Sequence, residues 1–137
     1  MSYLLDTNVL SETRKRRRDP GVTEWISLTP SGHMYLSTLT IGEIEQGITH
    51  LFQRGDHRQA AIVEDWLSDV IQEFGERIVP VTTPITRQWG RQRRVHPVPT
   101  IDALIAATAG VHGWTVVTRN TKDFEYTDVR VFNPFTG

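Results

Sequence analysis

Short apolar runs alternate with longer segments of helical periodicity along almost the whole sequence. Strands are expected at the apolar runs, which are residues 3–5, 34–37, 77–81, 114–118 and 129–132. Strands that alternate with helices favour a parallel sheet with helices on both faces. We therefore expect one three-layer α/β/α domain over residues 1–137, built on a parallel sheet of about five strands.

Helices are expected between these strands. The most distinct spans residues 60–74, where apolar side chains repeat at helical spacing and Gly75 follows as a terminator. The helix after Asp6 is expected to run into the basic residues 14–18, and another helix is expected to start at Thr40. Further helices are expected at residues 22–28, 84–94 and 100–109.

Composition excludes several kinds of protein. The 137 residues contain no cysteine, which excludes disulfides, zinc–thiolate sites and thiol nucleophiles. No apolar stretch approaches the roughly 20 residues that span a bilayer. The apolar content of 38% and the charged content of 23% are ordinary for a globular protein. We therefore expect a cytoplasmic protein that does not associate with a membrane.

Four acidic residues stand where an apolar run ends or a helix begins: Asp6, Glu43, Asp102 and Asp123. In a parallel α/β sheet such positions gather on one edge, where ligand crevices form. Carboxylates gathered there would repel one another, each pair at about 4 Å by roughly 4 kcal/mol at an effective dielectric near 20. A hard divalent cation bound by oxygen ligands relieves this repulsion. The pattern therefore predicts a metal site formed by these four side chains.

Each acid taken alone also fits a structural role. Asp6 could cap the following helix or form an Asx-turn, and Asp123 could belong to a surface turn. Glu43 follows Thr40 by three residues, as in a capping box, and Asp102 would suit the dipole at a helix start. The position of all four at one expected sheet edge favours the shared site.

The basic residues form two dense groups. Their members are Arg14, Lys15, Arg16, Arg17 and Arg18 in the first group, and Arg87, Arg91, Arg93 and Arg94 in the second. Arginine suits bidentate contact with phosphate. Charged side chains on an ordinary solvated surface are the alternative interpretation.

At four places the sequence resembles the motifs of PIN-domain ribonucleases. The matching runs are DTNVLSE at residues 6–12, TLTIGEI at 38–44, TIDALIAA at 100–107 and TRNTKDF at 118–124. The run VFNP at residues 131–134 is similar to the usual ending of the family. The match covers essentially the whole chain, in order. Among PIN domains the chain looks most like the VapC toxins of type II toxin–antitoxin pairs, near the FitB branch.

The resemblance implies a metal-dependent endoribonuclease that acts as a toxin. The four acids would hold Mg²⁺ or Mn²⁺, and three residues would support them: Asn8, Thr118 and Asn120. Hydrolysis of RNA by a metal-activated water would leave a 5′-phosphate and a 3′-hydroxyl.

The same resemblance implies partners. A cognate VapB-like antitoxin is expected to hold the toxin inactive, and a homodimer is expected because family members commonly dimerise. RNA is the substrate that the resemblance implies, and the arginine-rich groups would supply contacts with its phosphates. The residues expected to contact it are Arg14, Lys15, Arg16, Arg17, Arg18, Arg91 and Arg94.

Two other functions fit parts of the sequence. An aspartyl-phosphate phosphatase would use Asp6 as its nucleophile, but Asn8 stands where its second aspartate is needed. A non-catalytic module that binds nucleic acid or a protein partner would not need four carboxylates, because a binder of phosphate gains nothing from a negative pocket. Metal-dependent RNA cleavage distinguishes the ribonuclease from both.

Overall fold

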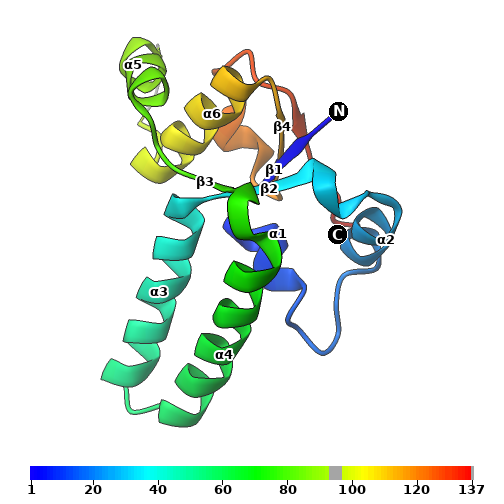
Figure 1. Cartoon of the computed structure of the whole chain (residues 1–137), viewed down its shortest axis with the longest axis vertical. Coiled ribbons are helices and arrows are strands. Elements are labelled where there is room, and N and C mark those ends of the chain that lie inside the picture. Colours follow the sequence, from blue (N-terminus) through cyan, green and yellow to red (C-terminus); the bar gives the residue numbers. More distant parts are fainter. Residues whose placement is uncertain (93–96, 137) are drawn as a thin grey trace.

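The computed structural model describes residues 1–92 and 97–136, and a five-stranded sheet forms its centre (Figure 1). The strands are β1 (Tyr3–Leu5), β2 (Met34–Ser37), β3 (Ile78–Val79), β4 (Thr115–Val117) and β5 (Val131–Phe132). They pair in parallel throughout, in the order β3-β2-β1-β4-β5. The prediction of a parallel sheet of about five strands is confirmed.

Helices cover both faces of this sheet. They are α1 (Thr7–Glu12), α2 (Pro20–Leu28), α3 (Thr38–Gln53), α4 (His57–Phe74), α5 (Thr83–Arg91) and α6 (Thr100–His112), with short 3₁₀ turns η1 (Ser31–His33), η2 (Gly75–Arg77) and η3 (Thr121–Phe124). Leu5 and Leu36 point to the face covered by α1 to α4, whereas Leu4 and Val116 point to the face covered by α6 and η3. This alternation follows from the period of two along a strand, and it gives the predicted three layers.

Two helices leave the body of the molecule as a hairpin. Figure 1 shows α3 and α4 lying side by side and projecting away from the sheet. Val63, Leu67 and Val70 of α4 are buried at helical spacing, as the periodicity predicted. Gly75 ends α4 with a φ of 52°, a conformation that favours glycine.

Some predicted boundaries were wrong. α3 begins at Thr38 rather than Thr40, because the hydroxyl of Ser37 accepts a hydrogen bond from the Leu39 N–H at 3.0 Å and caps the helix directly after β2. α1 ends at Glu12, so the basic residues 14–18 form a loop and not a helix.

Other elements differ only in length. β3 has two residues, because Arg77 belongs to η2 and Pro80 has no N–H to donate to a neighbouring strand. α6 continues through Gly110 and closes at Gly113, which has a φ of 73°. In the described part of the chain, no helix combines the length and the apolar character needed to cross a bilayer.

The strand order places β1 between β2 and β4. The direction of winding therefore reverses beside β1, and ligands in open α/β sheets bind at such a point, outside the carboxyl ends of the strands. The Asp6 N–H donates to the Val117 carbonyl at 2.9 Å, which extends the pairing of β1 with β4 beyond the end of β1. Asp6 and Thr118 consequently leave the sheet side by side.

Candidate functional site

Asp6 is a nearly buried acid at the end of β1, with 4% of its surface exposed. It caps α1, since its Oδ1 accepts the Thr7 N–H at 2.8 Å. Its Oδ2 accepts the Thr118 hydroxyl at 2.8 Å and the Asn8 side-chain amide at 3.4 Å. Asp6 therefore caps α1 through one carboxylate oxygen and accepts side-chain hydrogen bonds through the other, so both oxygens are held in place.

Thr118 and Asn8 form a network around this carboxylate. The Thr118 hydroxyl accepts the Asn8 amide at 3.3 Å and the Asn120 backbone N–H at 3.0 Å while it donates to Asp6. The Asn8 Oδ1 accepts the backbone N–H of Arg119 at 3.1 Å. Thr118 is fully buried. The structure thus brings the three residues named as supporting next to Asp6, with Asn120 contributing its backbone.

Glu43 approaches the same place from α3. It lies in the second turn of that helix and accepts the Thr7 hydroxyl through Oε1 at 2.5 Å. Because Ser37 caps α3, the capping-box role with Thr40 is wrong for Glu43. Thr7 was missed in the sequence, although its place directly after Asp6 is the signal that could have found it.

Asp102 connects all four acids electrostatically. It lies in the first turn of α6. Its pKa is raised from 3.8 to about 7, chiefly by burial. The charge of Asp6, a hydrogen bond with Asp123, and the charges of Asp123 and Glu43 also raise it. Burial also raises the pKa of Asp6, and the charge of Asp123 adds to this rise. The hydrogen bonds that Asp6 accepts from Thr118, Thr7 and Asn8 lower its pKa and offset part of the rise. The four predicted acids are therefore close enough to influence one another.

These carboxylates do not form a ready-made set of metal ligands. Among residues 1–92 and 97–136, no three acidic or histidine side chains are arranged as a group that could hold a metal ion. The donors are nevertheless all carboxylate oxygens, the atoms that hard divalent cations prefer. Raised pKa values near such a cluster are also typical of functional sites. The chemistry of the donor set fits a divalent cation, although their present positions are not those of a closed coordination sphere.

The first basic group lies on an exposed loop between α1 and α2. The loop follows Glu12, whose carboxylate forms an ion pair with Lys15 at 2.9 Å. Arg14 lies over the ring of Trp66, with its guanidinium carbon 6.0 Å from the ring centroid. Arg14 therefore lies on the face covered by α1 to α4, and among the described residues no ion pair joins a cation of this group to the four acids.

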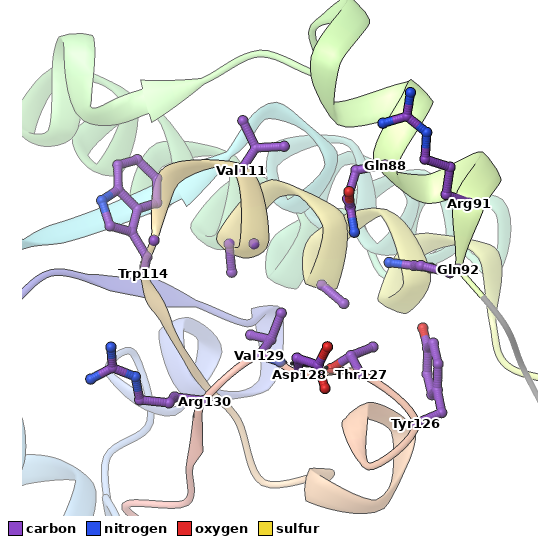
Figure 2. A pocket seen from close by; sticks show the side chains of 14 residues that line it. Gln88, Arg91, Gln92, Val111, Trp114, Tyr126, Thr127, Asp128, Val129 and Arg130 are labelled. Carbon is purple, nitrogen blue, oxygen red and sulfur yellow. Dashed lines mark hydrogen bonds between the residues drawn. The ribbon is translucent and has the colours of Figure 1, made fainter.

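The second basic group is separate from the acids. Arg91 ends α5 and borders a cavity of about 520 Å³ that lies between α5, α6 and residues 126–130 (Figure 2). In Figure 2 the guanidinium group of Arg91 points away from the opposite wall, which includes Tyr126 and Arg130. Arg94 lies outside the described residues. None of the four acids lines this cavity, so the cavity and the acidic cluster are different places.

Comparison with known proteins identifies relatives along nearly the full length of the chain. The sequence profile of the PIN domain matches residues 3–129. Toxin FitB of Neisseria gonorrhoeae is 32% identical, with 96% of this chain and 97% of the relative covered. VapC ribonuclease Y4jK of Sinorhizobium fredii is 28% identical, with 96% of each covered.

A solved structure shares the fold closely. The crystal structure of FitAcB from Neisseria gonorrhoeae superposes with a TM-score of 0.87 at 31% identity, covering 96% of this chain and 97% of that one.

Proposed function

The chain belongs to the PIN-domain family, and from this premise we propose that it is a metal-dependent endoribonuclease and the toxin of a VapBC-type toxin–antitoxin pair. The names of two relatives, a toxin and a VapC ribonuclease, support this proposal. Such an enzyme hydrolyses RNA phosphodiester bonds.

One observation carries the proposal. Four acids from segments far apart in the sequence meet at the carboxyl edge of the sheet, where burial, together with the charges of the other three, raises the pKa of Asp102 to about 7. A module that only binds RNA would be opposed by such a cluster, because RNA is itself an anion. A hydrolase that acts on phosphate esters with divalent cations requires it.

Mg²⁺ or Mn²⁺ would be held by Asp6, Glu43, Asp102 and Asp123. When bound, the ion would supply charge neutralisation at the phosphate and a nucleophile available near neutral pH. The donor set fits the ion because it consists only of carboxylate oxygens, and because Asp102 carries a pKa close to neutrality that a cation would lower.

The other residues orient these ligands. Thr118 and Asn8 fix the Oδ2 of Asp6, and the Thr7 N–H fixes its Oδ1. The Thr7 hydroxyl holds Glu43 toward the same edge. Asp102, with a pKa of about 7, is able to hold a proton on its carboxyl group near neutral pH and to release it as pH rises. No side chain of the protein needs to act as a nucleophile.

Partners are part of the proposal. We expect a VapB-like antitoxin that neutralises the chain, because the relative FitB is named a toxin. We also expect a homodimer, and RNA as the substrate in the cytoplasm. Size-exclusion chromatography with light scattering tests the dimer, and co-expression with the neighbouring small open reading frame tests the antitoxin.

The direct test of the activity is cleavage of a mixed RNA pool by purified wild type and by Asp6→Asn, each with Mg²⁺, with Mn²⁺ and with EDTA. We expect metal-dependent cutting by wild type that leaves 5′-phosphate ends, and none by the variant. Cutting that continues in EDTA, or equally in Asp6→Asn, would contradict the proposal. Binding of RNA without cleavage under every condition would favour the non-catalytic module instead.

A further inference from the structure

Residues 133–136, near the end of the chain, form a strap across the start of α2, and Figure 1 shows the C-terminal part of the chain beside that helix. The Thr136 N–H donates to both oxygens of Asp19, at 3.1 and 3.2 Å, and the Thr136 hydroxyl donates to Asp19 Oδ2 at 2.8 Å. A Cβ built on Gly21 would collide with the Pro134 carbonyl and lie 2.8 Å from Thr136 Cγ2. The strap is therefore tied by hydrogen bonds and packed so closely that only glycine fits beneath it.

The strap also contacts the side chain of Arg119. The guanidinium carbon of Arg119 lies 4.6 Å from the ring centroid of Phe135, the geometry of a cation–π contact. Phe135 is itself oriented by its backbone N–H, which donates to Asn133 Oδ1 at 2.9 Å. At its other end, Arg119 donates its backbone N–H to Asn8, which contacts Asp6. Arg119 thus begins beside the acidic site and extends along the strap.

Asp19 links the strap to the basic loop. Its backbone N–H donates to Glu12 Oε2 at 2.8 Å, and Glu12 pairs with Lys15. Glu12 and Asp19 therefore close the loop that contains residues 14–18, while the side chain of Asp19 holds Thr136. The strap joins Arg119 and the basic loop to the same side of the molecule.

We infer that Arg119 and the basic loop of residues 14–18 form one cationic track for RNA phosphates, which leads from the acids over the strap toward α2. Phe135 is the positioning residue of this track, because its ring holds the guanidinium group of Arg119, whose backbone lies beside the acidic site. Arginine provides the planar donors that phosphate recognition uses. The inference rests on the proposed ribonuclease function. It places the RNA path along Arg119 and the basic loop and not along Arg91 at the end of α5.

The salt dependence of RNA binding tests the track. Each phosphate contact made by a cation contributes about 0.7 to the slope of log affinity against log salt for single strands. The probe is a fluorescein-labelled single-stranded RNA of mixed sequence, and anisotropy is measured in an Asp6→Asn background so that the RNA stays intact. We expect Arg119→Ala to weaken binding several-fold and to reduce the slope by about 0.7.

Companion variants distinguish positioning from charge and from folding. Arg119→Lys keeps the charge and should retain the slope, whereas Phe135→Leu keeps the cation but loses the ring and should weaken binding without reducing the slope. Arg58→Ala is the matched control, an exposed arginine in the first turn of α4, and should change neither quantity. Thermal unfolding confirms that each variant is folded.

The outcomes separate this inference from the proposed function. An unchanged slope in Arg119→Ala, while wild type still cleaves RNA, overturns the track and leaves the ribonuclease intact. A reduced slope in Arg91→Ala alone would place the RNA path at α5 and would also overturn it. Failure of wild type to cleave the RNA pool removes the ribonuclease proposal and this inference together.

Discussion

The first turn of α6 carries Asp102 among three other acids, whereas its last turn borders the cavity of Figure 2 and carries no acidic residue. At the first turn, side chains from the end of β1, from α3 and from η3 converge, and burial with like charge shifts the pKa of Asp102 to about 7. In the second half of the helix, small residues such as Ala106, Ala109 and Gly110 border an open volume of about 520 Å³. Chemistry is expected where polar groups converge, which here is not at the cavity.

The difference has a simple physical origin. The carboxyl ends of β1 and β4 and the start of α6 meet at one edge, so their polar residues are forced together. The positive end of the α6 dipole favours a carboxylate there. The other end of α6 packs small side chains against residues 126–130, where no comparable set of acids faces them in the described residues.

The largest expected effect is the loss of RNA cleavage in Asp102→Asn. Removal of one charged ligand should reduce the rate by more than about 100-fold, because loss of even an outer partner of a ligand costs about 10–100-fold. Single-turnover cleavage of a defined RNA fragment measures this. A variant that retained wild-type activity would exclude Asp102 from the reaction.

A smaller loss is expected for Thr118→Val, which removes a buried hydroxyl and nearly conserves volume. The substitution leaves Asp6 without its 2.8 Å hydrogen bond, so cleavage should fall about 10–100-fold. Thr118→Ser keeps the hydroxyl and should recover most of the activity. If valine and serine behave alike in the same cleavage assay, Thr118 acts through packing alone.

Stability without metal should decrease as pH rises. Between pH 3.8 and about 7 the folded protein holds a proton on Asp102 that the unfolded chain has already released, and the raised pKa of Asp6 acts in the same direction. Stability falls with pH wherever the folded state binds more protons than the unfolded state. The melting temperature measured in EDTA should therefore fall as pH rises across this range, and it should fall less in Asp102→Asn, which lacks this carboxyl group. Parallel profiles for the two proteins would argue against the shift.

The smallest effect is expected at the cavity. Gly110→Leu would fill part of it, since a Cβ there meets Val129 Cγ2 at an ordinary 3.6 Å. Cleavage should change by no more than about twofold, the range of an ordinary surface substitution. Gly47→Leu, at an open helical glycine of α3, is the matched control for the change in helix propensity. A large loss of activity in Gly110→Leu alone would make the cavity part of the site.

Sequence reasoning predicted a parallel sheet, because strands alternate with helices, and it placed the acids at one sheet edge, because strand ends converge there. The order of the strands came only from the structure. The helix starts were harder to predict. Thr40 and Glu43 have capping-box spacing, but Ser37, the last residue of β2, caps α3 first. Local spacing cannot show which of two competing residues caps the helix, whereas the structure shows which hydroxyl accepts the helix N–H.

Contacts between distant residues also escaped the sequence. The Thr7 hydroxyl reaches Glu43 from 36 residues away, and Phe135 carries Arg119 on a strap that local pattern does not indicate. Such pairs depend on how helices and termini pack, so only the structure reveals them. The single-domain boundary of residues 1–137 and the assignment of the four acids as metal ligands remain predictions.

The most direct test of one shared acidic site is the shift in melting temperature that Mg²⁺ or Mn²⁺ produces in wild type and in four single variants, Asp6→Asn, Glu43→Gln, Asp102→Asn and Asp123→Asn. An ion that binds only the folded protein raises its stability. We predict a rise for wild type and a markedly smaller rise in every variant. A wild-type rise in any one of them would show that its carboxylate does not share the site, and no rise in wild type would contradict metal binding by this cluster.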